Sequence, residues 1–224
     1  LTIFYLNQSS EETLISETLI IKSTQRGERL TTQLPDGTVV TLNSESQISY
    51  PENFNGEERN VNLMGEAYFK VAKGKTFTVT TPNGEVAVLG TQFNVNSSED
   101  FFDVVCYEGK VGVKTETSNH ILLPGDAVRK INGDKAESFK TSKLEPTWVN
   151  GESTFRSVPL HYVLKAIENQ YEIVFDVNEI DDTTIFSGSF PHNNLNLALQ
   201  TVFETMDITY YEKEKRNIKL RYKR

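Results

Sequence analysis

The sequence predicts an all-β N-terminal domain, a sandwich or roll of many short strands, followed by a small α+β C-terminal domain. Short runs of alternating apolar residues fill the chain from about Thr24 to Phe139, and turn sequences rich in glycine, proline and aspartate separate them. Apolar residues at helical spacing appear only after Trp148. Alternation with a period of two residues is typical of half-buried strands, whereas the spacing i, i+3, i+4, i+7 is typical of helices.

Size and composition indicate an ordinary soluble protein. The chain has 224 residues, of which 37% are hydrophobic, and its net charge is −8. This length is enough for one large domain or two modest ones. An acidic chain has no excess of lysine and arginine to replace phosphate counterions, so nucleic acid is excluded as the main partner. The one basic run, over residues 215–224, alternates with apolar residues and is predicted to be an edge strand.

The all-β domain is predicted over residues 24–140, after a linker over residues 1–23. Turn sequences such as LPDGT from Leu34 and TPNGE from Thr81 separate its strands. Glycine supplies a positive φ in such turns, and proline presets the first turn position. The apolar pairs that mark the strands include Val40 and Leu42, Ile48 and Tyr50, Val61 and Leu63, Phe69 and Val71, and Phe77 and Val79.

The stretch VAVLGTQFNV contains a phase slip at Gly90 and Thr91, because the apolar residues on its two sides alternate in opposite phase. A bulge or corner explains the slip, since glycine tolerates a positive φ there. A second interpretation is self-cleavage, in which the Thr91 hydroxyl attacks the Gly90 carbonyl, the acyl group moves from nitrogen to oxygen, and water cuts the ester. A third is a ligand contact through the Gly90 backbone.

The α+β domain is predicted over residues 148–224 with the element order β-α-β-β-α-β-β. Pro159 starts the first helix, with Ser157 as a candidate cap, and Asn193 or Asn194 caps the second. The two amphipathic helices are expected to cover one face of a sheet. Their apolar residues are Leu160, Val163, Leu164, Ile167 and Tyr171 in the first helix, and Leu195, Ala198, Leu199, Val202 and Phe203 in the second.

Side chains for catalysis or metal binding are not clustered in the sequence. The three histidines, His120, His161 and His192, lie far apart, and no metal-ligand spacing, phosphate-binding loop or nucleophile elbow is present. We therefore expect no metal, no cofactor and no enzymatic activity apart from self-cleavage at Gly90–Thr91. The single cysteine is expected to be buried. Trp148 is expected to pack between the domains, with a sugar-stacking platform as the alternative.

Several motifs occur in an order that resembles the FecR family of membrane-spanning anti-sigma regulators. GEAYFKV from Gly65 and VLGTQFNV from Val88 are the most specific, and LPDGTVVTLN, YEGKVGV and LLPGDAV accompany them. The second half, with WVNGESTF, FSGSF and LNLALQTVFETMDITYY, is similar to the C-terminal domain of Bacteroidetes-type members. That domain is similar to the short N-terminal domain of secretins and TonB-dependent transporters.

The resemblance implies a periplasmic sensor anchored to the inner membrane. A full-length member has a cytoplasmic helical domain that holds an extracytoplasmic-function sigma factor, then one membrane helix, then the sensor. Residues 1–23 would be a juxtamembrane linker, with Leu1–Leu6 as the last turn of the membrane helix. This chain would contact the sigma factor only through the cytoplasmic domain, which lies outside it. Some members are processed at the motif that contains Gly90 and Thr91.

The expected partner is the signalling domain of an outer-membrane TonB-dependent transporter. Small α+β sheets have edge strands that can pair with a partner's strand. FSGSF, with Phe186 and Phe190, and DITYYE, with Tyr210 and Tyr211, are the candidate edges, although Phe186 and Phe190 also suit the core. Two other functions stay open: a secreted carbohydrate- or surface-binding β module, and a self-assembling module like those of secretins.

Overall fold

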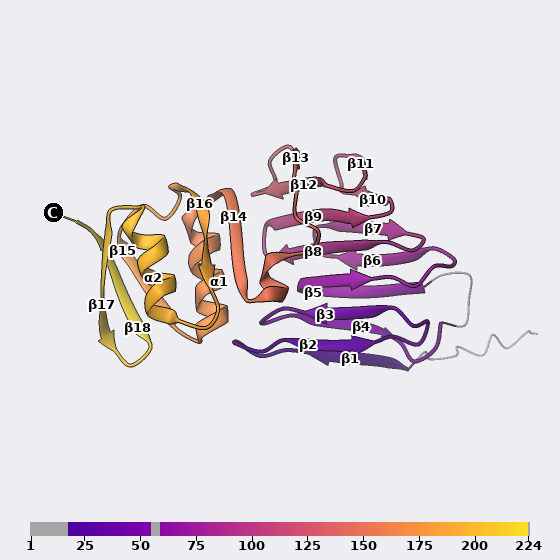
Figure 1. The fold of residues 1–224 in the computed structure, drawn as a ribbon, viewed down its shortest axis with the longest axis horizontal. Coiled ribbons are helices and arrows are strands. Elements are labelled where there is room, and N and C mark those ends of the chain that lie inside the picture. Colours follow the sequence, from indigo (N-terminus) through magenta and orange to yellow (C-terminus); the bar gives the residue numbers. More distant parts are fainter. Residues whose placement is uncertain (1–17, 55–58, 224) are drawn as a thin grey trace, which may run out of the picture.

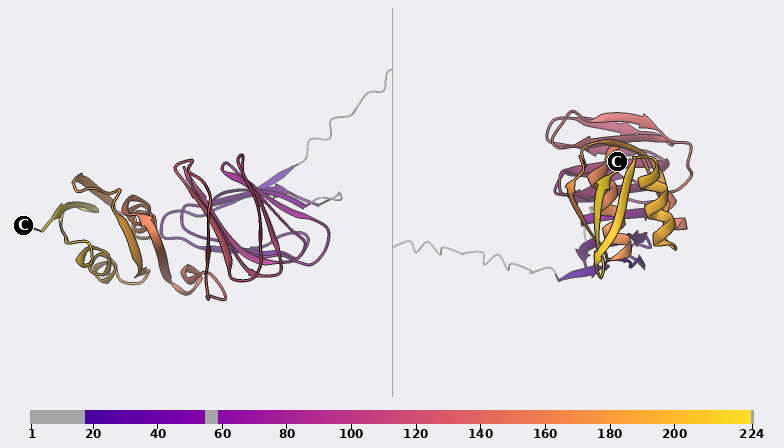
Figure 2. Two further views of the ribbon diagram at one scale, coloured as in Figure 1. Left: turned by 90° about the horizontal axis from the view of Figure 1, so that it is seen from above. Right: turned by 90° about the vertical axis from the view of Figure 1, so that its left-hand side faces the viewer.

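The computed structural model describes residues 18–54 and 59–223. They form two domains side by side along the long axis of the molecule (Figures 1 and 2). Each domain has its own buried apolar cluster. An all-β domain followed by a small α+β domain is the predicted fold class, which is confirmed.

Among the described residues, thirteen strands form the N-terminal domain as one curled sheet with two layers (Figure 1). The strands are β1 Leu19–Ser23, β2 Leu30–Gln33, β3 Val39–Leu42, β4 Gln47–Pro51, β5 Arg59–Lys70, β6 Phe77–Thr81, β7 Gly84–Val88, β8 Gln92–Ser98, β9 Phe101–Glu108, β10 Val111–Lys114, β11 Asn119–Leu122, β12 Asp126–Ile131 and β13 Glu137–Lys140. The first layer has the order β1-β4-β5-β6-β7-β10-β11, and the second has the order β2-β3-β5-β8-β9-β12-β13.

The predicted linker differs from the structure at its C-terminal end. Residues 1–17 of that linker lie outside the described residues, but Leu19–Ser23 is strand β1 and pairs with β4. Leu19 and Ile21 are exposed, so this strand lacks the buried apolar alternation that marks the others. Its place in the sheet comes from main-chain pairing, which the side-chain pattern does not reveal.

The long strand β5 joins the two layers. Its first half pairs with β4 and β6, and its second half pairs with β3 and β8. Gly65 lies at the change with φ +88°, and a Cβ there would come within 2.9 Å of the Ser46 Cα. Only glycine fits both the left-handed backbone and this close approach. The core between the layers is built from aromatic and branched residues, including a stacked Phe69–Phe93 pair.

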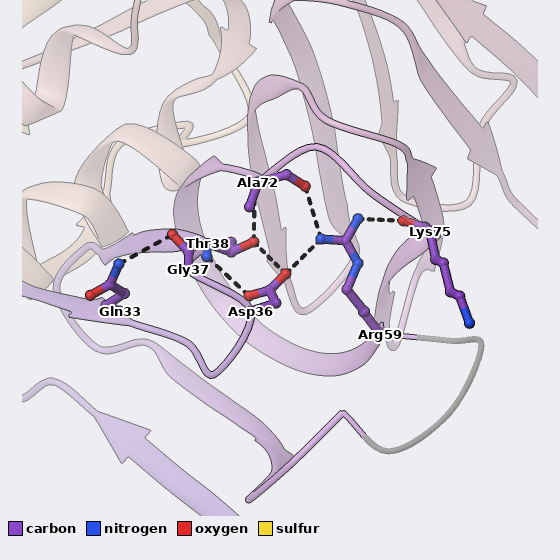
Figure 3. Close-up of polar contacts among 7 residues, drawn as sticks. All are labelled: Gln33, Asp36, Gly37, Thr38, Arg59, Ala72 and Lys75. Carbon is purple, nitrogen blue, oxygen red and sulfur yellow. Dashed lines mark hydrogen bonds and ion pairs between the residues drawn. The ribbon is translucent and has the colours of Figure 1, made fainter.

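A buried arginine fixes the turns at one end of the sandwich (Figure 3). Arg59 is only 7% exposed; its Nη1 pairs with Asp36 Oδ2 at 2.6 Å and donates to the Ala72 carbonyl at 2.8 Å. Its Nη2 donates to the Lys75 carbonyl. Thr38 donates to Asp36 and accepts from the Ala72 amide. Because the buried charge is paired and bonded to carbonyls, it holds two turns together.

The C-terminal domain has the predicted element order β-α-β-β-α-β-β. A short 3-10 helix, Thr147–Asn150, leads into it. Its strands form two separate sheets, β14-β16 and β15-β18-β17. The elements are β14 Glu152–Pro159, α1 Leu160–Tyr171, β15 Val174–Glu179, β16 Ile185–Pro191, α2 Leu195–Glu204, β17 Ile208–Glu214 and β18 Asn217–Tyr222.

Both helices pack between these two sheets (Figure 1). The expectation that they cover one face of a single sheet is therefore wrong. Parallel pairing of β15 with β18 creates a second sheet on the far side of the helices. Asn194 caps α2 by accepting from the Leu197 amide at 3.0 Å. Ser157 does not cap α1; instead the amides of Leu160 and His161 donate to main-chain carbonyls before β16.

The basic tail is the central strand of its sheet, not the predicted edge strand. β18 pairs with β15 on one side and with β17 on the other. Ile218 and Leu220 face the core, and Lys219 and Arg221, which alternate with them, face outward. Alternation describes the two faces of a strand and not its two edges, so the sequence could not distinguish these positions.

Candidate partner-binding site

The junction between the domains is built on the outer face of the second layer. Arg129 on β12 donates to Asp103 Oδ2 on β9 at 2.7 Å and to the Arg156 carbonyl on β14 at 2.6 Å. Its guanidinium lies 4.7 Å from the centre of the Phe139 ring. Burial raises the pKa of Asp103, and the Arg129 charge opposes that rise. One arginine thus connects two strands of the sandwich to the first strand of the next domain.

A second polar group at the junction contains the half-buried carboxylate of Glu66. Glu66 accepts hydrogen bonds from Asn43 and Asn94, each at 2.8 Å. Asn94 in turn accepts from the Trp148 indole nitrogen at 3.2 Å. Burial raises the pKa of Glu66 to about 7, and the Asp103 carboxylate adds to the rise. Trp148 is only 4% exposed, so it packs between the domains as expected and presents no platform for a sugar.

Further contacts close the junction at its two sides. Arg29 donates to the carbonyls of Trp148 and Val149 at 2.8 and 2.9 Å. Tyr162 on α1 donates to Asp100 at 2.7 Å, and the ring of Phe101 packs into the C-terminal core. A cavity of about 860 Å³ lies between these contacts, and Glu66, Asp103 and Trp148 are among its lining residues.

The described residues do not assemble catalytic chemistry at this junction. Ser153 Oγ and His192 Nε2 lie 2.9 Å apart, but His192 Nδ1 has no partner in the described part of the chain. Burial and the Arg29 charge lower the pKa of His192 to about 4, so it is neutral at pH 7. A nucleophilic serine needs a histidine oriented by a third group. The residues described also contain no group of three or more His, Cys, Asp or Glu side chains placed to hold a metal ion.

Gly90 and Thr91 lie where the chain crosses from β7 in the first layer to β8 in the second. Val86 and Val88 before the crossing and Phe93 and Val95 after it all face the same core, which explains the phase slip. The slip is therefore a corner between layers.

The reason for glycine at this corner differs from the expected one. The φ of Gly90 is not positive; a Cβ there would come within 2.9 Å of the Lys73 Cα, so close approach requires glycine. The Thr91 carbonyl accepts from the Val71 amide at 3.0 Å, and its hydroxyl donates to the Lys110 carbonyl at 3.2 Å. These contacts fix the turn.

The candidate edge residues fall into two groups. Phe186 and Phe190 are 2% and 0% exposed and belong to the C-terminal core, so their side chains are not available to a partner. Tyr210 and Tyr211 on β17 are 38% and 43% exposed. Both β16 and β17 pair with one strand only, so each leaves an unpaired edge within the described residues. The candidate site is therefore a pair of strand edges on the C-terminal domain.

The junction residues were missed by sequence reasoning. Glu66 follows the diagnostic glycine of GEAYFKV, and Asn94 lies inside VLGTQFNV, but both occupy outward-facing strand positions that ordinarily meet solvent. Polar residues at two such positions on neighbouring strands are the one signal that the sequence offers. Burial by a second domain is what gives them a role.

Comparison with known proteins assigns both halves of the chain. Residues 22–112 match the family described as FecR protein, and residues 152–220 match the family described as FecR, C-terminal. Two crystal structures of a candidate anti-sigma factor from Parabacteroides distasonis ATCC 8503, at 2.50 and 1.65 Å resolution, resemble the fold with TM-scores of 0.82 and 0.81. Each is 31% identical in sequence, and the match covers 92% of this chain and 100% of the other. No curated protein matches the chain.

Proposed function

The chain belongs to the FecR family of anti-sigma factors, and from this premise we propose that it is the periplasmic sensor portion of a transmembrane anti-sigma factor. In this role it binds the signalling domain of an outer-membrane TonB-dependent transporter. Binding changes the membrane-tethered protein and thereby controls an extracytoplasmic-function sigma factor. The sigma factor is held by a cytoplasmic domain that lies outside this chain, and an N-terminal helix anchors the sensor to the inner membrane.

The observation that carries this proposal is the pair of unpaired strand edges on the C-terminal domain. Among residues 18–54 and 59–223, β16 and β17 each pair with a single strand. An open edge offers main-chain donors and acceptors in a fixed array, and a partner's extended segment can complete it without special side chains. A small domain that ends in open edges suits protein recognition better than catalysis.

The contacts between the domains support transmission of a binding event. Arg129, Tyr162 and Arg29 tie the C-terminal domain to the sandwich at three places. A partner that docks on the C-terminal domain therefore acts on the sandwich as well, which precedes that domain in the sequence. Within residues 18–54 and 59–223, no helix has the length and apolar character to span a bilayer.

Affinity capture tests the proposal. The chain is immobilised and exposed to a detergent extract of the source organism's envelope. We expect recovery of a TonB-dependent transporter, lost when the transporter's N-terminal signalling domain is deleted. Recovery of glycans in place of a transporter would favour a carbohydrate-binding module, and large self-assembled species in size-exclusion chromatography would favour an assembly module. Either result would refute the sensor function.

A further inference from the structure

The C-terminal domain has four outer strand edges, and two of them are closed. At β14, the Arg156 carbonyl accepts from Arg129 of the sandwich, and the strand bulges between Phe155 and Val158, where Ser157 has φ +49°. A bulge and a covering domain both block further pairing. β14 also lies on the side that faces the sandwich (Figures 1 and 2).

The edge of β15 is closed by side chains of its own domain. The Phe175 amide donates to Glu168 of α1 at 2.8 Å, and the Asn178 amide donates to the Asp176 carboxylate at 3.3 Å. Its pairing with β18 is also interrupted between Asp176 and Glu179. Main-chain groups that already have partners cannot serve an added strand.

The edge of β17 is open but protected by charge. Glu212, Lys213 and Glu214 are consecutive and exposed, and the pairing shifts between Glu212 and Glu214. Consecutive charges and a bulge are features by which natural sheets discourage edge-to-edge pairing.

The edge of β16 has none of these protections. No residue from Ile185 to Pro191 is charged, and the strand itself runs without a bulge. Outside its pairing with β14, its main-chain groups have no partner in the described residues except the Pro191 carbonyl, which accepts from the Tyr171 hydroxyl. A two-stranded sheet is also the smallest possible sheet, so a third strand would strengthen it.

The side chains of β16 hold this edge in place. Phe186 and Phe190 are buried, and Gly188 lies beneath the Phe186 ring, where a Cβ would come within 2.6 Å of Phe186 Cζ. The backbone of β16 at Gly188 thus packs directly against the buried Phe186 ring. An edge fixed in advance costs little ordering entropy when a partner strand adds to it.

Charge selects the kind of strand that fits. Asp181 is exposed just before β16, and Glu152 is exposed opposite Pro191 at the other end. Hydrogen bonds from Thr183 lower the pKa of Asp181, which keeps it charged at neutral pH. An uncharged edge with an acidic residue at each end favours a segment with a neutral centre and basic flanks.

We propose that the outer edge of β16 is the docking edge of this sensor, and that it pairs with an extended, basic-flanked segment of the transporter's signalling domain. The proposal rests on the proposed function and names the surface that performs it. Main-chain hydrogen bonds along β16 provide the affinity, and the acidic residues Asp181 and Glu152 provide the specificity for a basic-flanked segment.

Paired charge variants on the two open edges test this proposal. Ile185→Lys with Ser189→Lys adds two positive charges to β16 outside the core. Thr209→Lys with Glu214→Gln changes the charge of β17 by the same two units without altering either tyrosine, and is the matched control. We expect the β16 variant to recover about tenfold less transporter from the envelope extract than the unchanged chain, which corresponds to about one lost hydrogen bond. The β17 variant is expected to recover as much as the unchanged chain.

Amide hydrogen exchange of the unchanged chain gives a second readout that needs no variant. With the purified transporter bound, we expect slower exchange at residues 185–190 and no change at residues 208–214. Three results would overturn the proposal and leave the sensor function standing. They are loss of capture by the β17 variant alone, slower amide exchange at β17 in place of β16, and pairing of β16 with a second copy of the chain. Failure of the unchanged chain to capture any transporter would refute the sensor function itself.

Discussion

At Glu66, burial disfavours the charged form of the carboxylate. Its carboxylate is held by two asparagines, and one of these, Asn94, also binds the indole of Trp148. Burial raises the pKa to about 7, so the side chain changes charge near neutral pH. A proton at Glu66 is therefore linked to the packing of the junction between the domains.

Glu66 is predicted to make stability depend on pH. Its pKa rises from 4.5 to about 7 on folding, so the folded chain binds more protons than the unfolded chain between these values. The favourable contribution is complete below pH 4.5 and is lost as pH rises through about 7. The full shift of the Glu66 pKa corresponds to about 3 kcal/mol in the free energy of unfolding. Because the side chain keeps some contact with solvent, we expect a contribution of about 2 kcal/mol.

Urea unfolding of Glu66→Gln at pH 5 and pH 8 measures this contribution. Between pH 5 and pH 8, the free energy of unfolding of the variant is expected to rise by about 2 kcal/mol relative to that of the unchanged chain. The comparison is made as a difference because His192, whose pKa is lowered to about 4, changes stability in the opposite direction. The exposed Glu137→Gln is the control. Equal pH dependence of the Glu66 variant and the unchanged chain would contradict the account.

At the scale of elements, the corner from β7 to β8 is held from two sides. The Gly74 amide donates to the Leu89 carbonyl at 2.9 Å, and the Val71 amide donates to the Thr91 carbonyl at 3.0 Å. Arg59 binds the same 72–75 turn from the other side (Figure 3). The layers are thus joined by a turn that has no room for a side chain at Gly90.

Gly90→Ala is predicted to lower the free energy of unfolding by about 1–3 kcal/mol, because the new Cβ meets the Lys73 backbone. Gly112→Ala is the control, since a Cβ there would make ordinary contact with the Ala87 carbonyl at 3.5 Å. Thermal denaturation compares the two. A control as unstable as the Gly90 variant would contradict the packing argument.

The intact mass of the unchanged chain tests self-cleavage at the same corner. We expect one species of 25.4 kDa after long incubation, since the Thr91 hydroxyl donates to Lys110 and the corner is explained by packing. Two fragments that separate after Gly90 would show that the hydroxyl attacks its own peptide bond.

Strands and helices with one buried face were predictable from the sequence. Their apolar residues recur every two residues in a strand or about every 3.6 residues in a helix, and this period identifies the buried face. This holds for Val61 and Leu63 in β5 and for the two helices of the C-terminal domain. Strand β1 was missed because Leu19 and Ile21 are exposed. The central place of β18 and the second sheet depend on main-chain pairing between distant segments, which no local period records.

At the scale of the whole molecule, the junction is stabilised by polar contacts around a few aromatic rings. Arg129 pairs with Asp103, binds the Arg156 carbonyl and packs on Phe139. These residues come from four strands, β9, β12, β13 and β14, so the junction could not be assembled from sequence alone. The family, in contrast, was evident from ordered motifs such as GEAYFKV.

Arg129→Gln is predicted to uncouple the domains and to cost about 3 kcal/mol, because it leaves the Asp103 carboxylate buried without its partner. Trp148, the single tryptophan, lies at the junction and reports on it directly. In the unchanged chain, its fluorescence and the far-ultraviolet circular dichroism should change at the same urea concentration. In the variant, the fluorescence should change first.

The double variant Asp103→Asn with Arg129→Gln is the control for that prediction. Removal of both charges should restore part of the lost stability, since no buried carboxylate is left unpaired. Coincident transitions in the single variant would show that Arg129 does not couple the domains.

The sensor function is tested by a binding isotherm between this chain and the purified signalling domain of the transporter recovered by capture. We expect saturable binding with one signalling domain per chain, and a marked loss of affinity in the β16 variant. Binding that is absent for the signalling domain, but retained by the rest of the transporter or by envelope glycans, would contradict the sensor function.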